Sequence, residues 1–401
     1  MTLRQCVRCL LCGQKHILRI AIGHGARQEH TIHCEECGEE FSVALDLDQA
    51  NAGWTFNCVS NCEQTSEGGV VVNLHPEFLV PPELRNIDDV SINILACQAM
   101  MKDRGVNKFI SEESDYKEAL KRSREDYGVE GEWVDLKRCW SQLNKGNRER
   151  ATELVGVYGK KYADTGCSPE SWIFPFVLRS ISPGQFFLFE NAIKRVAEAI
   201  KKDESRTEAF LEFHSTRIFS ANLKRYFSIF EKFFSAYSDY SAHFFGYKFG
   251  NFQPGGAVSS CKFGDTMYFY GNAFEAIGSN MTTLACLNNL LKGRKYGEFQ
   301  TEGFKIEQYM SSDKSGRADC FADIPEFAAL ADKYTSSVRN GSHHGTFELD
   351  EKTMNVSYTP RKTMVVETIS YSGYIDMCVS MFFTCAVMTG IDCFLWNITK
   401  K

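Results

Sequence analysis

The chain has 401 residues, of which 43% are hydrophobic and 24% charged, a balance typical of folded proteins with room for two or three domains. Its net charge of −6 excludes a surface that is basic throughout, although a local basic site for RNA is compatible with it. No apolar segment follows the N-terminal residues MTLRQCVRCLLCG, so we expect no secretory signal and a cytoplasmic protein. The 16 cysteines are then expected to be thiols and metal ligands rather than disulfides.

The first 75 residues differ in character from the rest of the chain. Short β-rich runs, KHILRIAIG, EEFSVALDL and GGVVVNL, alternate there with cysteine pairs and with Gly and Asn turns. We therefore predict a β module over residues 1–75. No internal repeat is evident in the sequence. Three prolines follow within seven residues, Pro76, Pro81 and Pro82, and predict a semi-rigid linker over residues 76–87.

Two C-x-x-C-G motifs, CLLCG at 9–13 and CEECG at 34–38, are the most specific signal in the sequence. The two-residue gap allows one tight turn to aim both sulfurs at a single metal, and the glycine permits a positive φ after it. The four expected ligands of a tetrahedral zinc site are Cys9, Cys12, Cys34 and Cys37. Four thiolates leave no open coordination position, so the predicted zinc is structural, and zinc-dependent hydrolysis is the weaker hypothesis. The arrangement resembles a zinc ribbon.

Other residues near these motifs remain alternatives. Cys6, in CVRC, is also in C-x-x-C spacing but lacks the following glycine, and His33 adjoins Cys34. Cys58 and Cys62 could hold a second metal. No further pair at ribbon spacing follows them, so we favour packing residues or spare thiols.

Beyond the linker, residues 88–214 are predicted to be a helical middle region. The run at 88–105 has an acidic start and a glycine stop, and the run at 115–128 is amphipathic and highly charged. The run at 182–203 opens with a possible Ser182 cap and with Pro183 in the first helical turn.

The segment 215–247 mixes basic and aromatic residues. A base-stacking surface is one interpretation. Seven aromatic residues, however, follow the three-four spacing of one helix stripe, which favours a packed core: Phe219, Tyr226, Phe230, Phe233, Tyr237, Tyr240 and Phe244. Further helices are expected at 266–292, 319–339 and 366–397, with a β-hairpin at 347–358.

Residues 374–396 are apolar enough to suggest a membrane span. Asp376 and Asp392 bracket only about fifteen uncharged residues, fewer than the roughly 20 that a spanning helix needs. We therefore predict a helix buried by protein and no membrane partner.

Residues 337–350, SVRNGSHHGTFELD, hold the candidate catalytic site. Within them, RNGSHHG resembles the R-N-x-x-x-H-G signature of HEPN ribonucleases (higher eukaryotes and prokaryotes nucleotide-binding domain). The matching positions are Arg339, Asn340, His344 and Gly345. The resemblance implies a C-terminal helical bundle that cleaves RNA without a metal. It also implies a site built from two facing motifs in a homodimer or higher homo-oligomer, and a toxin or abortive-infection effector of antiviral defence.

The residue types suit RNA cleavage by a 2′-hydroxyl. Histidine is the side chain that can move the proton near neutral pH, so His344 is the candidate acid/base. Arg339 can offset the charge on the phosphorane, and Asn340 can orient a phosphate oxygen or hold the histidine tautomer. The expected products are a 2′,3′-cyclic phosphate and a 5′-hydroxyl. Four nearby cations are candidates for guiding the RNA backbone: Arg294, Lys295, Arg361 and Lys362.

The spacing by itself is weak, and the local geometry leaves alternatives. Two other pairs have similar spacing in the β module, Arg19 with His24 and Arg27 with His33. On a continuous helix, positions five apart lie about 140° from one another, so His343 and not His344 would share the face of Arg339. Either the helix breaks at Gly341 and brings His344 round, or His343 acts. A third interpretation makes Gly341 a C-cap, with the histidines on the last carbonyls.

The sequence as a whole predicts a mainly α protein. It comprises a β-rich zinc ribbon (1–75), a linker (76–87), a helical middle region (88–214) and a HEPN-like helical bundle with a small β-hairpin (215–401). The expected function is that of an endoribonuclease that binds RNA and self-associates, with the ribbon as a candidate site for a regulatory protein or nucleic acid. The alternative is a catalytically inactive HEPN-like module for dimerisation or nucleotide binding, with the ribbon as an adaptor.

Overall fold

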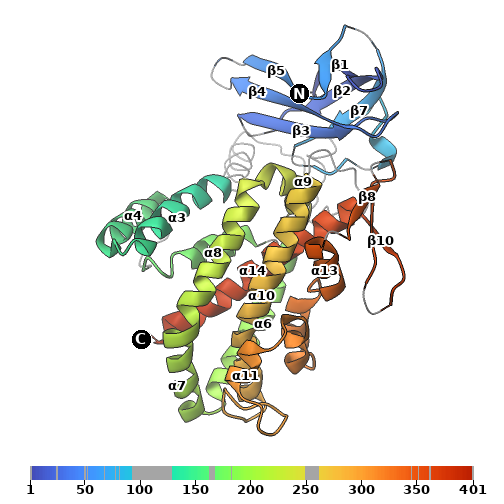
Figure 1. Cartoon of the computed structure of the whole chain (residues 1–401). Coiled ribbons are helices and arrows are strands. Elements are labelled where there is room, and N and C mark those ends of the chain that lie inside the picture. The colour runs from blue at the N-terminus through green and yellow to red at the C-terminus, as the bar shows by residue number, and fades with distance from the viewer. Residues whose placement is uncertain are drawn as a thin grey trace, which may run out of the picture. The chain divides into compact units, whose positions relative to one another are not determined.

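The computed structural model in Figure 1 describes residues 2–23, 26–48, 51, 53–66, 68–76, 78–80, 82–92, 129–161, 168–181, 183–248, 262–344, 346–350, 352–360 and 363–399. The mainly α class with an N-terminal strand region is confirmed. The helices expected at 88–105 and 115–128 fall almost entirely outside the described residues, as does the Ser182 cap.

The chain forms two compact units, each assembled from three stretches of sequence. The first comprises Met1–Ser111, Ala236–Gly271 and Ser337–Val379, and the second comprises Glu112–Ser235, Asn272–Ser336 and Ser380–Lys401. Two long helices, α10 (Phe263–Leu291) and α14 (Tyr371–Thr399), contribute to both units. The units therefore divide the chain differently from the predicted segments, which were continuous in sequence.

Seven strands form the N-terminal module: β1 (Thr2–Cys9), β2 (Lys15–Ala21), β3 (Arg27–His33), β4 (Glu40–Asp48), β5 (Gly53–Ser60), β6 (Cys62–Gln64) and β7 (Val70–Leu74). They make two sheets, one in the order β6-β1-β2-β7 and one in the order β3-β4-β5. Strand β7 lies parallel to β2, and the other pairs are antiparallel. The expected N-terminal strand region is therefore present, and three of its strands coincide with the predicted runs.

The two cysteine motifs occupy equivalent hairpins, which is an internal repeat that the sequence alone did not indicate. In the first hairpin Arg8 pairs with Lys15, and in the second His33 pairs with Glu40, so both members shift by 25 positions (8 to 33 and 15 to 40). The core positions on these strands match in apolar character rather than identity, as in Val7 and Ile32. Outside the two C-x-x-C-G turns, such a repeat is hard to detect from residue identities.

The proline-rich stretch that was predicted to be a semi-rigid linker has buried side chains. Phe78, Leu79 and Val80 are all buried, and Phe78 and Val80 pack in one cluster with Ala21 of β2. Burying these side chains is favourable by roughly 1.5–3 kcal/mol each. This burial favours a segment packed on the protein over the extended spacer that the prolines suggested. A short 3-10 helix, η1 (Pro82–Leu84), follows.

The second unit is built from helices. The first are α3 (Val129–Asn144), α4 (Arg148–Lys161), α5 (Ile173–Ser180), α6 (Pro183–Lys201), α7 (Glu204–Phe213) and α8 (Phe219–Ser235), with a π-helical turn η2 (His214–Ile218) between the last two. The aromatic stripe expected at 215–247 continues from α8 into α9 (Tyr237–Lys248) of the first unit. Phe219, Tyr226, Phe230, Phe233, Tyr240 and Phe244 are buried. The core interpretation of the stripe is confirmed.

The single helix predicted at 319–339 is wrong. Instead the chain forms α11 (Ile306–Ser311) and a series of short turns, η3 (Lys314–Phe321), α12 (Pro325–Ala328) and η4 (Ala329–Ala331), before α13 (Ser336–His344). Pro325 has no backbone N–H and begins a new helix. The ring of Tyr334 stacks on Phe274 at 3.9 Å, and its hydroxyl donates to the Lys314 carbonyl at 2.9 Å. These tertiary contacts override the local helical pattern.

The hairpin after α13 gains a third strand. Strands β8 (Glu348–Asp350) and β9 (Asn355–Tyr358) pair as expected, and β10 (Glu367–Ser370) pairs antiparallel with β9. Residues 367–370, predicted to open the last helix, are therefore in a sheet, and α14 begins at Tyr371.

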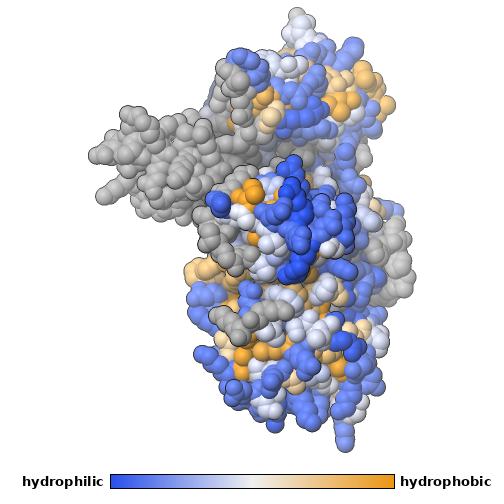
Figure 2. Space-filling view, turned by 90° about the vertical axis from the view of Figure 1, so that its left-hand side faces the viewer, coloured by the Kyte–Doolittle hydropathy of each residue, from blue (hydrophilic) through white to orange (hydrophobic). Residues whose placement is uncertain are grey.

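Helix α14 is the one described helix that is long and apolar enough to cross a membrane. In the structure 89% of its most apolar window is buried by protein, which agrees with the predicted core helix. On the side of the protein shown in Figure 2, hydrophilic residues cover most of the described surface and hydrophobic ones form separate patches.

Candidate functional sites

The four predicted metal ligands come together. The Sγ atoms of Cys9, Cys12, Cys34 and Cys37 all lie within 4.8 Å of one another. The two cross-hairpin approaches are 3.9 Å between Cys9 and Cys37 and 3.5 Å between Cys12 and Cys34. This spacing suits a single metal ion held by four sulfurs.

Backbone hydrogen bonds shape both turns in the same way. Gly13 N donates to the Cys9 carbonyl at 3.0 Å, and Gly38 N donates to the Cys34 carbonyl at 2.8 Å. The two glycines have φ values of 78° and 77°, a region that side chains other than glycine rarely adopt. The positive φ of these turns therefore explains why glycine follows each C-x-x-C pair.

The thiols differ in their surroundings. A backbone hydrogen bond at Gln14 lowers the pKa of Cys12, whereas burial raises the pKa of Cys34 to about 12. A buried thiol with a raised pKa ionises readily only when a cation is close to it, which a bound metal would provide.

The alternative ligands lie outside the cluster. His33 contacts the Gly38 carbonyl through Nδ1 at 3.2 Å, so that nitrogen donates within the turn. Cys62 is buried and its thiol donates to the Ser42 carbonyl at 3.4 Å, a packing role. Among the described residues, the four cysteines are the one group of three or more His, Cys, Asp or Glu side chains that could hold a metal.

Helix α13 carries the arginine–histidine motif without a break. It runs from Ser336 through Gly341 to His344, so the expected break at Gly341 and its role as helix terminator are wrong. The glycine is needed for packing, because a Cβ atom there would lie 2.1 Å from Cε1 of Phe347. One residue on, the Ser342 hydroxyl lies 2.7 Å from the hydroxyl of Tyr374 on α14.

The two residues at the start of the motif touch each other. Arg339 Nη1 donates to Asn340 Oδ1 at 3.0 Å, and both side chains are half-buried. The backbone of His343 and His344 completes the last turn of α13. On this unbroken helix, residue 343 lies about 40° round the axis from residue 339, and residue 344 about 140°.

The four cations predicted to guide RNA do not form one described group. The Arg294 guanidinium donates to Asn289 Oδ1 at 3.0 and 3.2 Å and to the Glu298 carbonyl at 3.2 Å, so it holds the turn after α10. Lys295 is exposed in the same turn. Arg361 and Lys362 lie outside the described residues, as does Gly345 of the motif.

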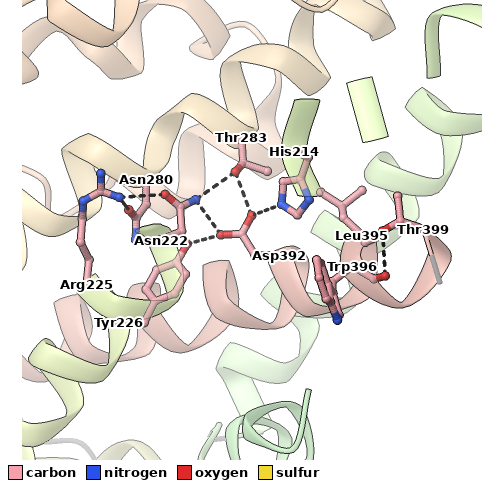
Figure 3. A network of polar contacts seen from close by, with 10 residues as sticks. All are labelled: His214, Asn222, Arg225, Tyr226, Asn280, Thr283, Asp392, Leu395, Trp396 and Thr399. Atoms are coloured by element: carbon pink, nitrogen blue, oxygen red, sulfur yellow. Dashed lines mark hydrogen bonds and ion pairs between the residues drawn. The ribbon is translucent and has the colours of Figure 1, made fainter. Parts of the chain in front are cut away.

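A buried carboxylate in the second unit was not singled out as a site from the sequence (Figure 3). Asp392 of α14 is 1% exposed and accepts four hydrogen bonds. Its donors are His214 Nε2 at 2.9 Å, Asn222 Nδ2 at 2.8 Å, the Tyr226 hydroxyl at 2.8 Å and the Thr283 hydroxyl at 2.8 Å. The cluster joins η2, α8, α10 and α14 around one charge.

This network stabilises the helices rather than reacting with a substrate. His214 and Asp392 are 0% and 1% exposed, so neither side chain is open to solvent in this structure. A second layer links Arg225 to Asn222 Oδ1 at 3.1 Å and to Asn280 Oδ1 at 3.2 Å (Figure 3). The available sequence signal was Asp392 itself, one of two aspartates in a mostly apolar helix, because a buried carboxylate must find partners.

No protein-family model, characterised protein or solved structure matches this chain.

Proposed function

We propose that this protein is a metal-independent endoribonuclease of the HEPN type that acts as a toxin or antiviral-defence effector. The observation that supports this function is the R-N-x-x-x-H part of the motif in one short helix, with Arg339 and Asn340 side by side and a histidine pair in the last turn. Half-buried polar side chains at a helix end can be held in place by packing and still meet a ligand.

The continuous helix favours His343 as the residue that moves the proton. Position 343 is one helical turn from Arg339, whereas position 344 points about 140° away. We therefore assign His343 as the first candidate for general acid/base catalysis and His344 as the second. This order is the reverse of the one that the family pattern suggests.

The proposed reaction breaks the P–O5′ bond of RNA. The histidine takes the proton of the 2′-hydroxyl, whose oxygen attacks the phosphorus as the P–O5′ bond breaks. The leaving 5′-oxygen receives a proton from water, and the histidine returns its proton to the solvent. The Arg339 guanidinium offsets the charge that develops on the phosphoryl oxygens. Asn340, bonded to Arg339, orients the guanidinium. The products are a 2′,3′-cyclic phosphate and a 5′-hydroxyl.

The four-cysteine cluster supports a structural zinc ion in the N-terminal module. Zinc prefers tetrahedral sulfur ligands, and four cysteines leave no position for water or substrate. We infer that zinc holds the two equivalent hairpins together, and that the module is the place where a regulatory protein or nucleic acid would bind.

The test is cleavage of RNA by purified full-length protein and its variants, with and without EDTA. We expect His343→Ala to reduce the rate by roughly 10²–10⁴, with a comparable loss for Arg339→Ala. The matched control is Arg150→Ala, which removes an exposed arginine of α4 that is paired with Glu153 in the same helix. End analysis of the fragments should find cyclic phosphates.

Two results would oppose the proposal. Release of no RNA fragments by the wild-type protein in either condition would favour the inactive dimerisation or nucleotide-binding module. Equal activity of wild type, His343→Ala and His344→Ala would place any observed cleavage outside this motif. Sedimentation at several concentrations checks the dimer that a composite site requires.

A further inference from the structure

A cleft of about 390 Å³ lies between α3 and α8 of the second unit, where aromatic rings of the two helices meet. Its volume falls in the range of small-molecule sites, roughly 300–1,000 Å³. The lining residues follow one face of each helix: Trp133, Lys137, Trp140, Ser141, Asn144 and Lys145 from α3 and its end, and Lys224, Phe227, Ser228 and Glu231 from α8.

The inner wall of this cleft, the α3–α8 cleft, is made of aromatic rings packed against one another. The ring of Trp140 stacks on Phe227 at 4.0 Å with 5° between the planes, and Trp133 lies 5.6 Å from the same phenylalanine. Trp133 is held in turn by Phe234 at 5.3 Å. Trp140 is half-buried, so part of this ordered aromatic surface lines the opening. A planar ring that stacks there would meet a wall that needs no rearrangement.

The rim carries positive charge on a chain whose net charge is −6. Three lysines and one glutamate line the cleft, and Lys137 is paired with Glu231 at 2.7 Å. Lys145 and Lys224 are exposed and have no ion-pair partner among the residues that the structure describes. The larger groove at the ends of α6 and α10 is different, since its Arg195 and Lys292 are paired with acidic residues.

We propose that the α3–α8 cleft binds a nucleotide, with the base against Trp140 and the phosphate against Lys145 and Lys224. Base–aromatic stacking with nearby cations is the chemistry by which proteins bind single-stranded nucleic acid, and a free nucleotide offers the same groups. The bound nucleotide can belong to an RNA chain or be free. Binding of RNA in this cleft rests on the proposed ribonuclease function, whereas binding of a free nucleotide does not.

The experiment measures binding to the full-length protein by calorimetry and tryptophan fluorescence, with AMP, a 2′-O-methyl hexaadenylate and inorganic triphosphate as probes. The methylated oligonucleotide lacks the attacking hydroxyl, so binding is read without cleavage. We expect Trp140→Leu to weaken the Kd roughly 5- to 150-fold, the loss of one stacked base. Trp140→Phe keeps an aromatic ring and should retain most of the affinity.

The exposed lysines provide a second, independent readout. The double variant Lys145→Ala/Lys224→Ala should make the dependence of log Kd on log salt shallower by about 1–2. The matched control, Lys201→Ala in the larger groove, should leave Kd unchanged. Binding of AMP assigns the site to free nucleotides, and binding of the oligonucleotide alone assigns it to RNA.

Three outcomes would overturn the nucleotide site. In the first, neither AMP nor the oligonucleotide binds. In the second, a ligand binds but none of the cleft variants weakens its binding. In the third, inorganic triphosphate binds as tightly as the oligonucleotide does. Each is independent of whether Arg339 and His343 support cleavage, because the binding assay requires no chemistry.

Discussion

Replacing Asp392 tests the buried network, because one carboxylate satisfies four donors. The Asp392→Ala variant leaves the donors of His214, Asn222, Tyr226 and Thr283 facing a small cavity. The hydroxyls can rotate and Asn222 Nδ2 still has Thr283 Oγ1 at 3.2 Å, but His214 Nε2 has no second acceptor in the network. Removing one partner from a buried charged network costs about 3–5 kcal/mol, so we expect a loss of that size.

A graded series separates charge from shape. In Asp392→Asn the remaining oxygen can still accept from His214 and Thr283, and the Tyr226 hydroxyl can turn to accept from the new amide. The amide nitrogen also faces Asn222 Nδ2, so one donor–donor contact takes the place of a hydrogen bond. We expect a loss of about 1–2 kcal/mol for this variant. Tyr226→Phe removes one donor and leaves no buried donor unsatisfied, so its cost should be about 1 kcal/mol.

Urea unfolding is the measurement, followed by fluorescence and circular dichroism. Trp396 is a suitable reporter because it lies one turn from Asp392 and stacks on Phe219 at 4.5 Å. The control is Asp323→Ala, an exposed acid paired with Lys292, expected to cost about 0–1 kcal/mol. The reasoning is refuted if Asp392→Ala is no more destabilising than Asp323→Ala, or if the alanine and asparagine variants are equal.

Three further changes test other parts of the structure. If the four-cysteine cluster holds the proposed metal, Cys34→Ser should lower the content of bound metal and the melting temperature, measured by metal analysis and calorimetry, whereas Cys58→Ser, outside the cluster, should alter neither. Gly341→Ala should destabilise by about 1–3 kcal/mol in urea unfolding, because its methyl group would overlap the Phe347 ring, and a neutral result would contradict the packing role. Burial lowers the pKa of His243 to about 4, so the unfolded state binds more protons between pH 6.5 and 4 and stability should fall as the pH falls through that range. His243→Gln should make that part of the stability–pH profile shallower, and an unchanged slope would be contrary to this assignment.

The features predicted from sequence are those that nearby residues determine. Each C-x-x-C-G turn specifies its own sulfur spacing and positive φ, so Cys9, Cys12, Cys34 and Cys37 could be assigned before the structure was known. The aromatic stripe of α8 likewise follows from helical periodicity. In both cases the pattern and its structural consequence lie within a few turns of chain.

The features that were missed depend on residues far apart in sequence. Tyr334 reaches back to Lys314 and Phe274, which replaces a predicted helix by turns. Asp392 needs donors from three other elements, 109 to 178 positions away in sequence. Neither contact can be read from local periodicity, because periodicity identifies a buried face without identifying its partner.

The unbroken helix α13 connects the fold to the choice of catalytic histidine. Helix α13 is continuous at Gly341, and the Phe347 ring packs against that glycine. Position 344 can therefore reach the helix face of Arg339 only if the helix breaks there and the Phe347 ring moves. Loss of RNA cleavage in His344→Ala and not in His343→Ala would therefore imply that the helix breaks at Gly341 when RNA binds. Gly341→Ala should then reduce cleavage as well, since alanine resists the break that glycine permits. Loss in His343→Ala alone requires no such change, because the motif would act in the conformation described.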